Sequence, residues 1–144
     1  MSKAKAQELP TVELDRRYFT VDQANRALVL VKRIVGDVLG DYQRVLDLQE
    51  VLEAHQHAGE AERAQQTQER IIELVKRLQG CSDELIELGA EMKDWSTGVV
   101  DFPTLAGGQE VQLCWRHGEE SILFWHRSDD GCGCRRDILT LPSE

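Results

Sequence analysis

The sequence has no long apolar segment and no excess of basic residues. Its longest uninterrupted apolar run, Ala27 to Val31, is far shorter than the roughly 20 residues that a membrane-spanning helix needs. The opening stretch MSKAKAQELPTVELDRR has no apolar centre of the kind that a signal peptide carries. A formal net charge of -9 opposes binding to the phosphate backbone of nucleic acids. We therefore expect a cytoplasmic protein with no membrane and no nucleic-acid partner.

The sequence also lacks a phosphate-binding glycine loop and any pair of Cys-x-x-Cys motifs. Its glycine pair, in LAGGQE, is typical of a turn between strands and not of a loop that opens a helix. The two histidines of HQH, His55 and His57, are two residues apart and do not share a helix face. Four cysteines in a chain without an export signal are expected to stay reduced, so free thiols are the default and disulfides the weakest interpretation. No cofactor is required by these patterns.

Helical periodicity dominates the first two thirds of the chain. After a loose lead-in over residues 1–17, Thr20 and Gln23 have the spacing of a capping box, which predicts a helix beginning at Val21. Apolar residues then recur at intervals of three and four, and the same spacing returns from Ile71 to Leu88 after a polar segment around Gly59. We predict a long antiparallel helical hairpin over residues 18–94. Its length, about 45 to 50 Å at 1.5 Å per residue, leads us to expect a partner at the far end.

Two glycines, Gly36 and Gly40, lie inside the first predicted helix. Each costs up to about 1 kcal/mol relative to alanine in a helix interior. We expect them to weaken the helix locally or to permit a close backbone contact.

From residue 95 onward the chain is rich in β-branched and aromatic residues separated by glycine and proline. We predict three short strands, at Val99–Phe102, Glu110–Arg116 and Ser121–Arg127. With the helices they make an α+β fold, in which a small antiparallel sheet of about three strands packs on one end of the hairpin. Residues 18–141 then form a single domain, with its β-part and tail at 95–141.

The predicted register decides which side chains share a sheet face. A symmetric pairing of the last two strands around HGEE sets Trp115 opposite Ile122 and Val111 opposite His126. It places His126 on the face that should cover the helices. Cys114 and Trp125 fall on the other face, where they form either an apolar contact patch or a surface covered by the tail DILTLP.

Four segments of the sequence together resemble a known family. They are YFTVDQANRAL, GVVDFP, VQLCWRHGEESILFWH and DGCGCRR, and the resemblance runs from Tyr18 to Ile138. The sequence is similar to an uncharacterised bacterial family catalogued as domain of unknown function 2203. That family brings no assigned activity. The resemblance implies the following positions of interest: Asp101, Phe102, Pro103, Trp115, Gly118, Glu119, Trp125, His126 and Arg135. Relatives carry a glycine-rich segment ending in Gly-Arg where this chain has GCGCR, so Cys132 and Cys134 depart from the family pattern.

The stretch from His126 to Cys134 is the best candidate for a metal site. His126, Cys132 and Cys134 are close in sequence, and two glycines let the loop wrap around an ion. Zinc or iron would need three or four converging ligands. Cys114 is excluded from this set by the predicted register. Reduced loop thiols without a metal are the alternative interpretation.

A ligand-binding or catalytic role has a wider set of candidate residues. They are Asp101, Trp115, Glu119, Trp125, His126 and Arg135. Asp101 could orient His126 through a hydrogen bond, which a buried structural histidine would make as well. Direct contact between Glu119 and His126 is not expected, because they lie near opposite ends of the last strand.

Two functions of different classes follow. The first is a cytoplasmic interaction or assembly module that self-associates through the helical hairpin or binds another protein. The second is a metal-binding or small-ligand-binding protein, with enzymatic activity left open, organised around Asp101, His126, Cys132, Cys134 and Arg135.

Overall fold

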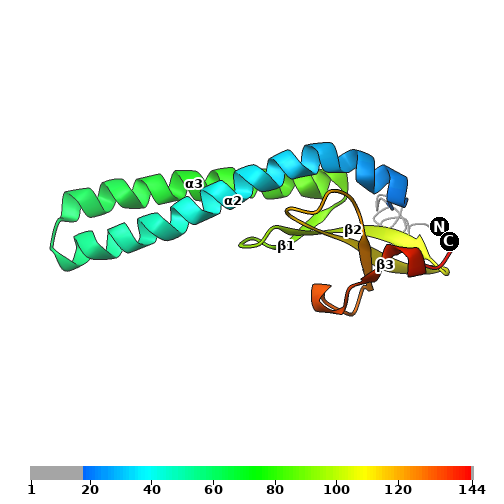
Figure 1. Cartoon of the computed structure of the whole chain (residues 1–144). Helices are drawn as coiled ribbons and strands as arrows, with labels where there is room; N and C mark the ends of the chain where they lie inside the picture. Colours follow the sequence, from blue (N-terminus) through cyan, green and yellow to red (C-terminus); the bar gives the residue numbers. More distant parts are fainter. Residues whose placement is uncertain (1–17, 144) are drawn as a thin grey trace, which may run out of the picture.

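Residues 18–143 fold into two long helices and a five-stranded antiparallel sheet (Figure 1). The computed structural model describes residues 18–143, with the backbone only of Cys132. The predicted lead-in at residues 1–17 lies outside the described residues. The α+β class is confirmed. No helix in residues 18–143 is long and apolar enough to cross a membrane.

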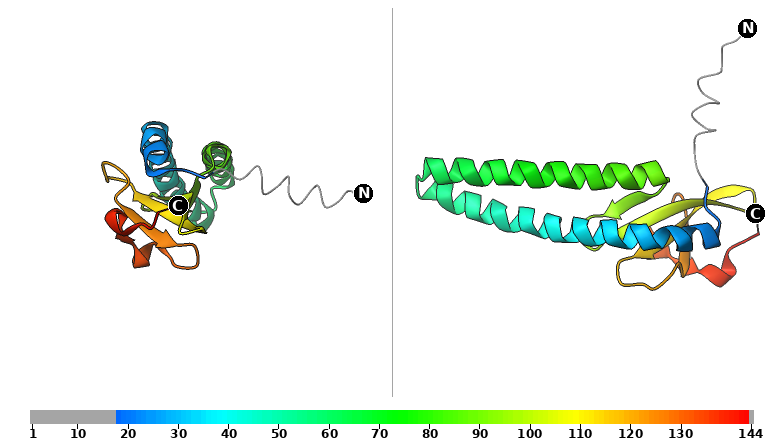
Figure 2. Two further views of the ribbon diagram at one scale, coloured as in Figure 1. Left: turned by 90° about the vertical axis from the view of Figure 1, so that its right-hand side faces the viewer. Right: turned by 90° about the horizontal axis from the view of Figure 1, so that it is seen from above.

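Helix α2 (Val21–His57) and helix α3 (Ala61–Leu88) lie side by side and run in opposite directions (Figures 1 and 2). The capping box is confirmed, since Thr20 Oγ1 accepts from the amide of Gln23 and Gln23 Oε1 accepts from the amide of Thr20. Residues Ala58–Glu60 connect the two helices. Helix α3 ends at Gly89 in the left-handed conformation, φ 100°, which glycine adopts at no steric cost.

The sheet is larger than the sequence predicted. Its strands are β1 (Glu91–Asp94), β2 (Val99–Ala106), β3 (Gln109–Arg116), β4 (Phe124–Arg127) and β5 (Arg136–Asp137), and they are ordered along the sheet as they are along the chain. The prediction of about three strands is wrong because the short edge strands β1 and β5 carry almost no pattern of their own. The predicted helical part, 18–94, also extended too far, since β1 begins soon after α3 ends.

Strand β2 contains a proline, which a strand paired on both sides normally excludes. Pro103 fits because β1 pairs with β2 only as far as Asp101. The carbonyl of Pro103 accepts from the amide of Phe19. The nitrogen and carbonyl of one strand residue point to the same side. The nitrogen of Pro103, which has no hydrogen to donate, therefore faces a position beyond the end of β1.

One face of the sheet packs against the helices. Alternate residues of the central strands, among them Phe102, Leu113, Trp115 and Trp125, join the helices in one apolar core. Phe19, just before α2, meets the edge of the Phe102 ring with centroids 5.2 Å apart. The other face of the sheet is turned away from this core.

The predicted register between β3 and β4 is wrong by one residue. Leu113 pairs with Trp125 and Gln112 pairs with His126. A shift of one residue moves every side chain to the opposite face. His126 therefore lies on the face turned away from the helices together with Cys114, and Trp125 lies on the core face.

Candidate functional site

The face of the sheet turned away from the core carries a wide cavity of about 1260 Å³. Alternate residues of four neighbouring strands line it, and the end of α3 and the loop after β4 complete its wall. The lining includes Glu91, Asp101, Gln112, Arg116, His126 and Asp130. Acidic residues outnumber lysine and arginine in the lining.

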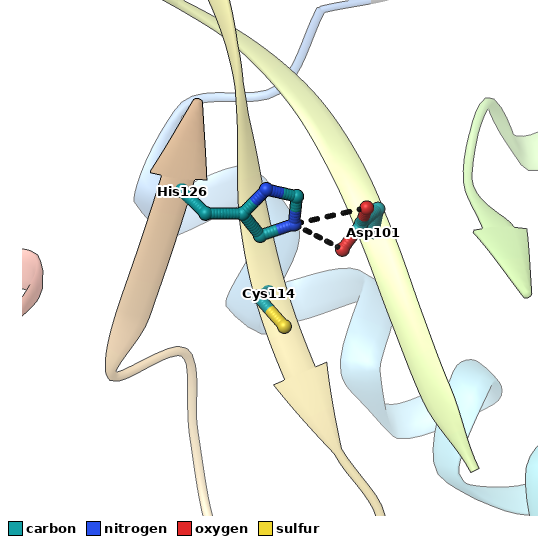
Figure 3. A group of neighbouring side chains, drawn as sticks. All are labelled: Asp101, Cys114 and His126. Carbon is teal, nitrogen blue, oxygen red and sulfur yellow. Dashed lines mark hydrogen bonds and ion pairs between the residues drawn. The ribbon is translucent and has the colours of Figure 1, made fainter. Parts of the chain in front are cut away.

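Asp101 and His126 form the buried floor of this cavity. Asp101 is on β2 and His126 is on β4, so the two side chains meet over β3, which lies between them (Figure 3). Nε2 of His126 lies 3.1 Å from each carboxylate oxygen of Asp101. The two side chains are only 4% and 3% exposed. The expected hydrogen bond between them is confirmed.

The contact of Nδ1 of His126 indicates where one proton of the ring lies. Nδ1 lies 2.8 Å from the carbonyl oxygen of Arg127, which can only accept, so Nδ1 carries a proton. An ionised Asp101 also only accepts, and a proton on Nε2 then satisfies both partners. The carboxylate of Asp101 is the largest cause of the raised pKa of His126, and it outweighs the opposite effect of burial. The two contacts and the raised pKa favour the protonated form of His126 next to Asp101.

Cys114 on β3 completes a group of three possible metal ligands. Its sulfur, a carboxylate oxygen of Asp101 and a ring nitrogen of His126 lie within 4.8 Å of one another, and all three residues are buried. In Figure 3 Cys114 lies next to the contact between the other two. Tetrahedral zinc, with bonds near 2.0 to 2.3 Å, holds its ligand atoms about 3.4 to 3.7 Å apart, so small movements would bring these donors around one ion. The prediction that Cys114 cannot share an ion with His126 is wrong, because it depended on the wrong register.

Cys114 is disulfide-bonded in the structure, whereas Cys81 and Cys134 are free. The expectation that all four cysteines are free thiols is therefore wrong for Cys114. A disulfide sulfur lacks the charge of a thiolate, so Cys114 is a metal ligand only after reduction.

The metal site predicted at His126, Cys132 and Cys134 is not the one formed by the described residues. Cys134 is exposed and does not belong to the group around His126. The side chain of Cys132 lies outside the described part of the chain. Within that part, the group of metal-ligand type is Asp101, Cys114 and His126.

Glu119 and Arg135 pair with each other, outside the cavity lining. Nη2 of Arg135 donates to both carboxylate oxygens of Glu119, at 2.7 and 2.6 Å. The guanidinium carbon lies 3.9 Å from the centroid of the Phe124 ring. Glu119 also accepts from the amide of Arg116, so this ion pair holds the loop between β3 and β4.

The two tryptophans among the candidates are core residues. Trp115 is 1% exposed, and its Nε1 donates to the carbonyl of Glu119. Trp125 is covered by the tail, since its Nε1 donates to the carbonyl of Asp137 and to Thr140 Oγ1. The tail thus contacts Trp125, although Trp125 and Cys114 do not share the sheet face that was predicted for them. Asp101 and His126 are thus the two predicted ligand-binding residues that line the cavity.

Among the polar residues of the cavity wall that sequence reasoning missed are Glu110, Gln112 and Ser128. Glu110 accepts from Tyr18 Oη and from Gln112 Nε2, and Gln112 also donates to Ser128 Oγ. Residues 110, 112 and 114 alternate along β3. With the correct register, this alternation alone would have placed Glu110, Gln112 and Cys114 on the same face as His126.

The fold and the cavity define an α+β protein with a buried carboxylate–histidine pair at the floor of an acidic cavity. The chain belongs to the family described as uncharacterized conserved protein (DUF2203), whose sequence model matches residues 17–138. The resemblance noted from the four segments is confirmed. Searches of curated proteins and of solved structures found no match.

Proposed function

We propose that this protein binds a divalent transition-metal ion, of the zinc type, through Asp101 and His126 at the floor of the cavity. The observation that carries the proposal is the arrangement of the His126 ring. Metal-binding histidines typically donate one ring N–H to a backbone carbonyl or carboxylate, which orients the other nitrogen toward the ion. His126 has this arrangement, with Nδ1 on the carbonyl of Arg127 and Nε2 directed at Asp101.

The surroundings favour a cation. The cavity wall contains six acidic residues, Glu87, Glu91, Asp94, Asp101, Glu110 and Asp130, against Lys93 and Arg116. Such a surface raises the local concentration of cations. The cavity leaves room for water or a small polar ligand on the open side of the ion, which is a property of zinc sites that take part in chemistry.

The proposal is tested by metal content and affinity. Full-length protein kept under a reducing agent should bind one Zn²⁺ per chain in calorimetry. Asp101→Asn and His126→Gln should each weaken binding by about 10-fold or more, as expected for the loss of a ligand. Glu91→Gln is the matched control, because it removes a carboxylate from the cavity wall and leaves the donor group intact.

Unchanged zinc affinity in both variants would contradict the proposal. Asp101 and His126 would then be a buried structural ion pair. Comparing the thermal unfolding of the variants separates loss of binding from loss of the fold.

We also propose self-association through the middle and outer parts of α2 and α3, in a protein that we place in the cytoplasm. Four apolar side chains there are exposed by 39 to 46%: Leu46, Val51, Ile72 and Val75. Light scattering across a concentration series should show an oligomer. Ile72→Gln with Val75→Gln should shift it to the monomer, whereas Val29→Gln, on the other half of α2, should not. A monomer at every concentration would rule this out.

A further inference from the structure

Cys114 belongs to two chemical arrangements that exclude each other. Its sulfur is in a disulfide, and it also lies in the donor group with Asp101 and His126. A thiolate is a strong zinc ligand, whereas a disulfide sulfur is a poor one. We infer that the thiol–disulfide state of Cys114 controls metal binding at this site. The inference rests on the proposed function.

The sheet keeps the sulfur of Cys114 on the face of Asp101 and His126 in both the disulfide and the thiol state. Cys114 is 0% exposed and lies on the central strand, directly opposite Asp101 on one side and Phe124 on the other. A strand side chain cannot reach the other face unless the register slips. Reduction therefore releases the sulfur beside Asp101 and His126, where it can act as the third ligand.

The charges of Cys114, Asp101 and the ion also link zinc binding to the thiol–disulfide state of Cys114. With Cys114 as a thiolate, its negative charge and that of Asp101 balance the two positive charges of the ion. With Cys114 in a disulfide, Asp101 is the one anionic ligand among the three donors, and one positive charge of the ion has no anionic ligand. An uncompensated buried charge is strongly unfavourable, so the disulfide state should bind zinc weakly.

The chemical steps balance with a dithiol as the reductant. The dithiol supplies two electrons and two protons, the S–S bond of Cys114 breaks, and two protein thiols form while the dithiol closes to its own disulfide. Zn²⁺ then displaces the proton of the Cys114 thiol and forms a zinc–sulfur bond. Oxidation by a small disulfide runs the exchange in reverse and releases the ion.

The chain offers a cysteine for a matched control. Cys81 is a free thiol on α3, outside the donor group. Its pKa is raised, first by burial and then by the acidic residues Glu84, Asp37 and Asp41. A neutral thiol of this kind is a weak nucleophile and a poor metal ligand.

The experiment measures Zn²⁺ affinity of the full-length protein by competition with a chromophoric chelator. One sample is reduced with a dithiol and the other is oxidised with glutathione disulfide, and peptide mapping verifies the state of Cys114. We expect oxidation to weaken zinc binding about 10-fold or more, the effect of losing one ligand. Cys114→Ser should bind weakly in both samples, and Cys81→Ser should behave as the wild type.

Two results would overturn the inference in distinguishable ways. If reduced and oxidised wild-type protein bind zinc equally, and Asp101→Asn still loses binding, the proposed function stands and control by Cys114 is wrong. If neither form binds zinc, the proposed function fails and the inference fails with it. The comparison of the two wild-type samples does not depend on whether Cys114→Ser folds.

Discussion

His126 is held by two acceptors, the carbonyl of Arg127 and the carboxylate of Asp101, and both favour its protonated form. This double contact is available only to a residue placed on the same face as Asp101. It explains why a histidine is stable in a position that is 3% exposed. A neutral ring could donate to only one of these two acceptors.

The raised pKa of His126 predicts that the metal-free protein loses stability as the pH rises. Because the carboxylate of Asp101 raises the folded-state pKa above 6.5, the contribution is complete below 6.5 and is lost as pH rises through the folded-state pKa. Urea unfolding in the presence of a chelator, from pH 5.5 to pH 9, should show this decline. His126→Gln should lack it. An equal decline in the variant would assign the effect to another group.

Arg135 is expected to stabilise the loop between β3 and β4. Arg135→Ala should lower the free energy of unfolding by about 2 kcal/mol, because the partly buried carboxylate of Glu119 loses its charged donor. Arg127→Ala is the matched control, since its ion pair with Asp129 is exposed and should contribute less than about 0.5 kcal/mol. Equal effects in urea unfolding would argue against a special role for Arg135.

Among the secondary-structure elements, the helices were predicted well and the sheet only in part. The start of α2 and the turn at Gly59 follow from local signals, namely a capping box and a break in periodicity. The edge strands β1 and β5 are short and pair through the backbone, so their own residues carry little information. The predicted α+β class did not depend on them.

Asp101 and His126 were among the predicted site residues, but one register error gave the wrong sheet face and left out Cys114. Symmetric pairing around HGEE is the simplest assumption, but the loop there is held by contacts with distant parts of the chain. The amide of Ile122 donates to Asn25 Oδ1 on α2, and Lys32 Nζ donates to the carbonyl of Glu120. Neither contact has a signature in the sequence of the hairpin. The predicted register placed His126 on the core face and Trp125 on the other face, whereas the structure has the two reversed. The predicted site was therefore placed on the wrong face of the sheet.

Alanine substitutions at Gly40 and at Gly98 should have opposite effects on the stability of the protein. An added Cβ at Gly40 in α2 meets no atom within 4 Å, so Gly40→Ala should stabilise the protein by about 0.5 to 1 kcal/mol. The expectation of a close backbone contact at Gly36 or Gly40 is wrong for the same reason. At Gly98, φ is +79° and an added Cβ lies 2.9 Å from His117 Cβ, so Gly98→Ala should destabilise. Melting temperatures of the two variants should shift in opposite directions.

The molecule as a whole has an uneven distribution of buried residues. Between Val45 on α2 and Ile71 on α3, all residues are described and none is buried. The halves of the helices beside the sheet contain the buried side chains, from Ala24 to Val45 and from Ile71 to Leu85. The far half of the helix pair therefore depends mainly on contacts between the two helices.

This distribution predicts a gradient of hydrogen exchange along α2 and α3. Amides near the turn at Gly59 should exchange fastest, because local opening there exposes little apolar surface. Amides around Val31 and Leu85 should exchange slowest. Mass spectrometry at low and high protein concentration measures both. Uniform protection at low concentration would contradict the gradient, and protection that appears only at high concentration would support contact between copies at the far end.

One end of the described chain is held by β2, and the other end is held by the turn that follows β2. The amide of Phe19 donates to the carbonyl of Pro103, and the amide of Gly107 donates to the carbonyl of Ser143. The turn at Ala58–Glu60 lies at the opposite end of the molecule (Figure 1). The protein therefore suits a circular permutation in which a linker connects residue 143 to residue 18 and the chain is reopened at Gly59. Such a permutant would carry any fused reporter far from the cavity.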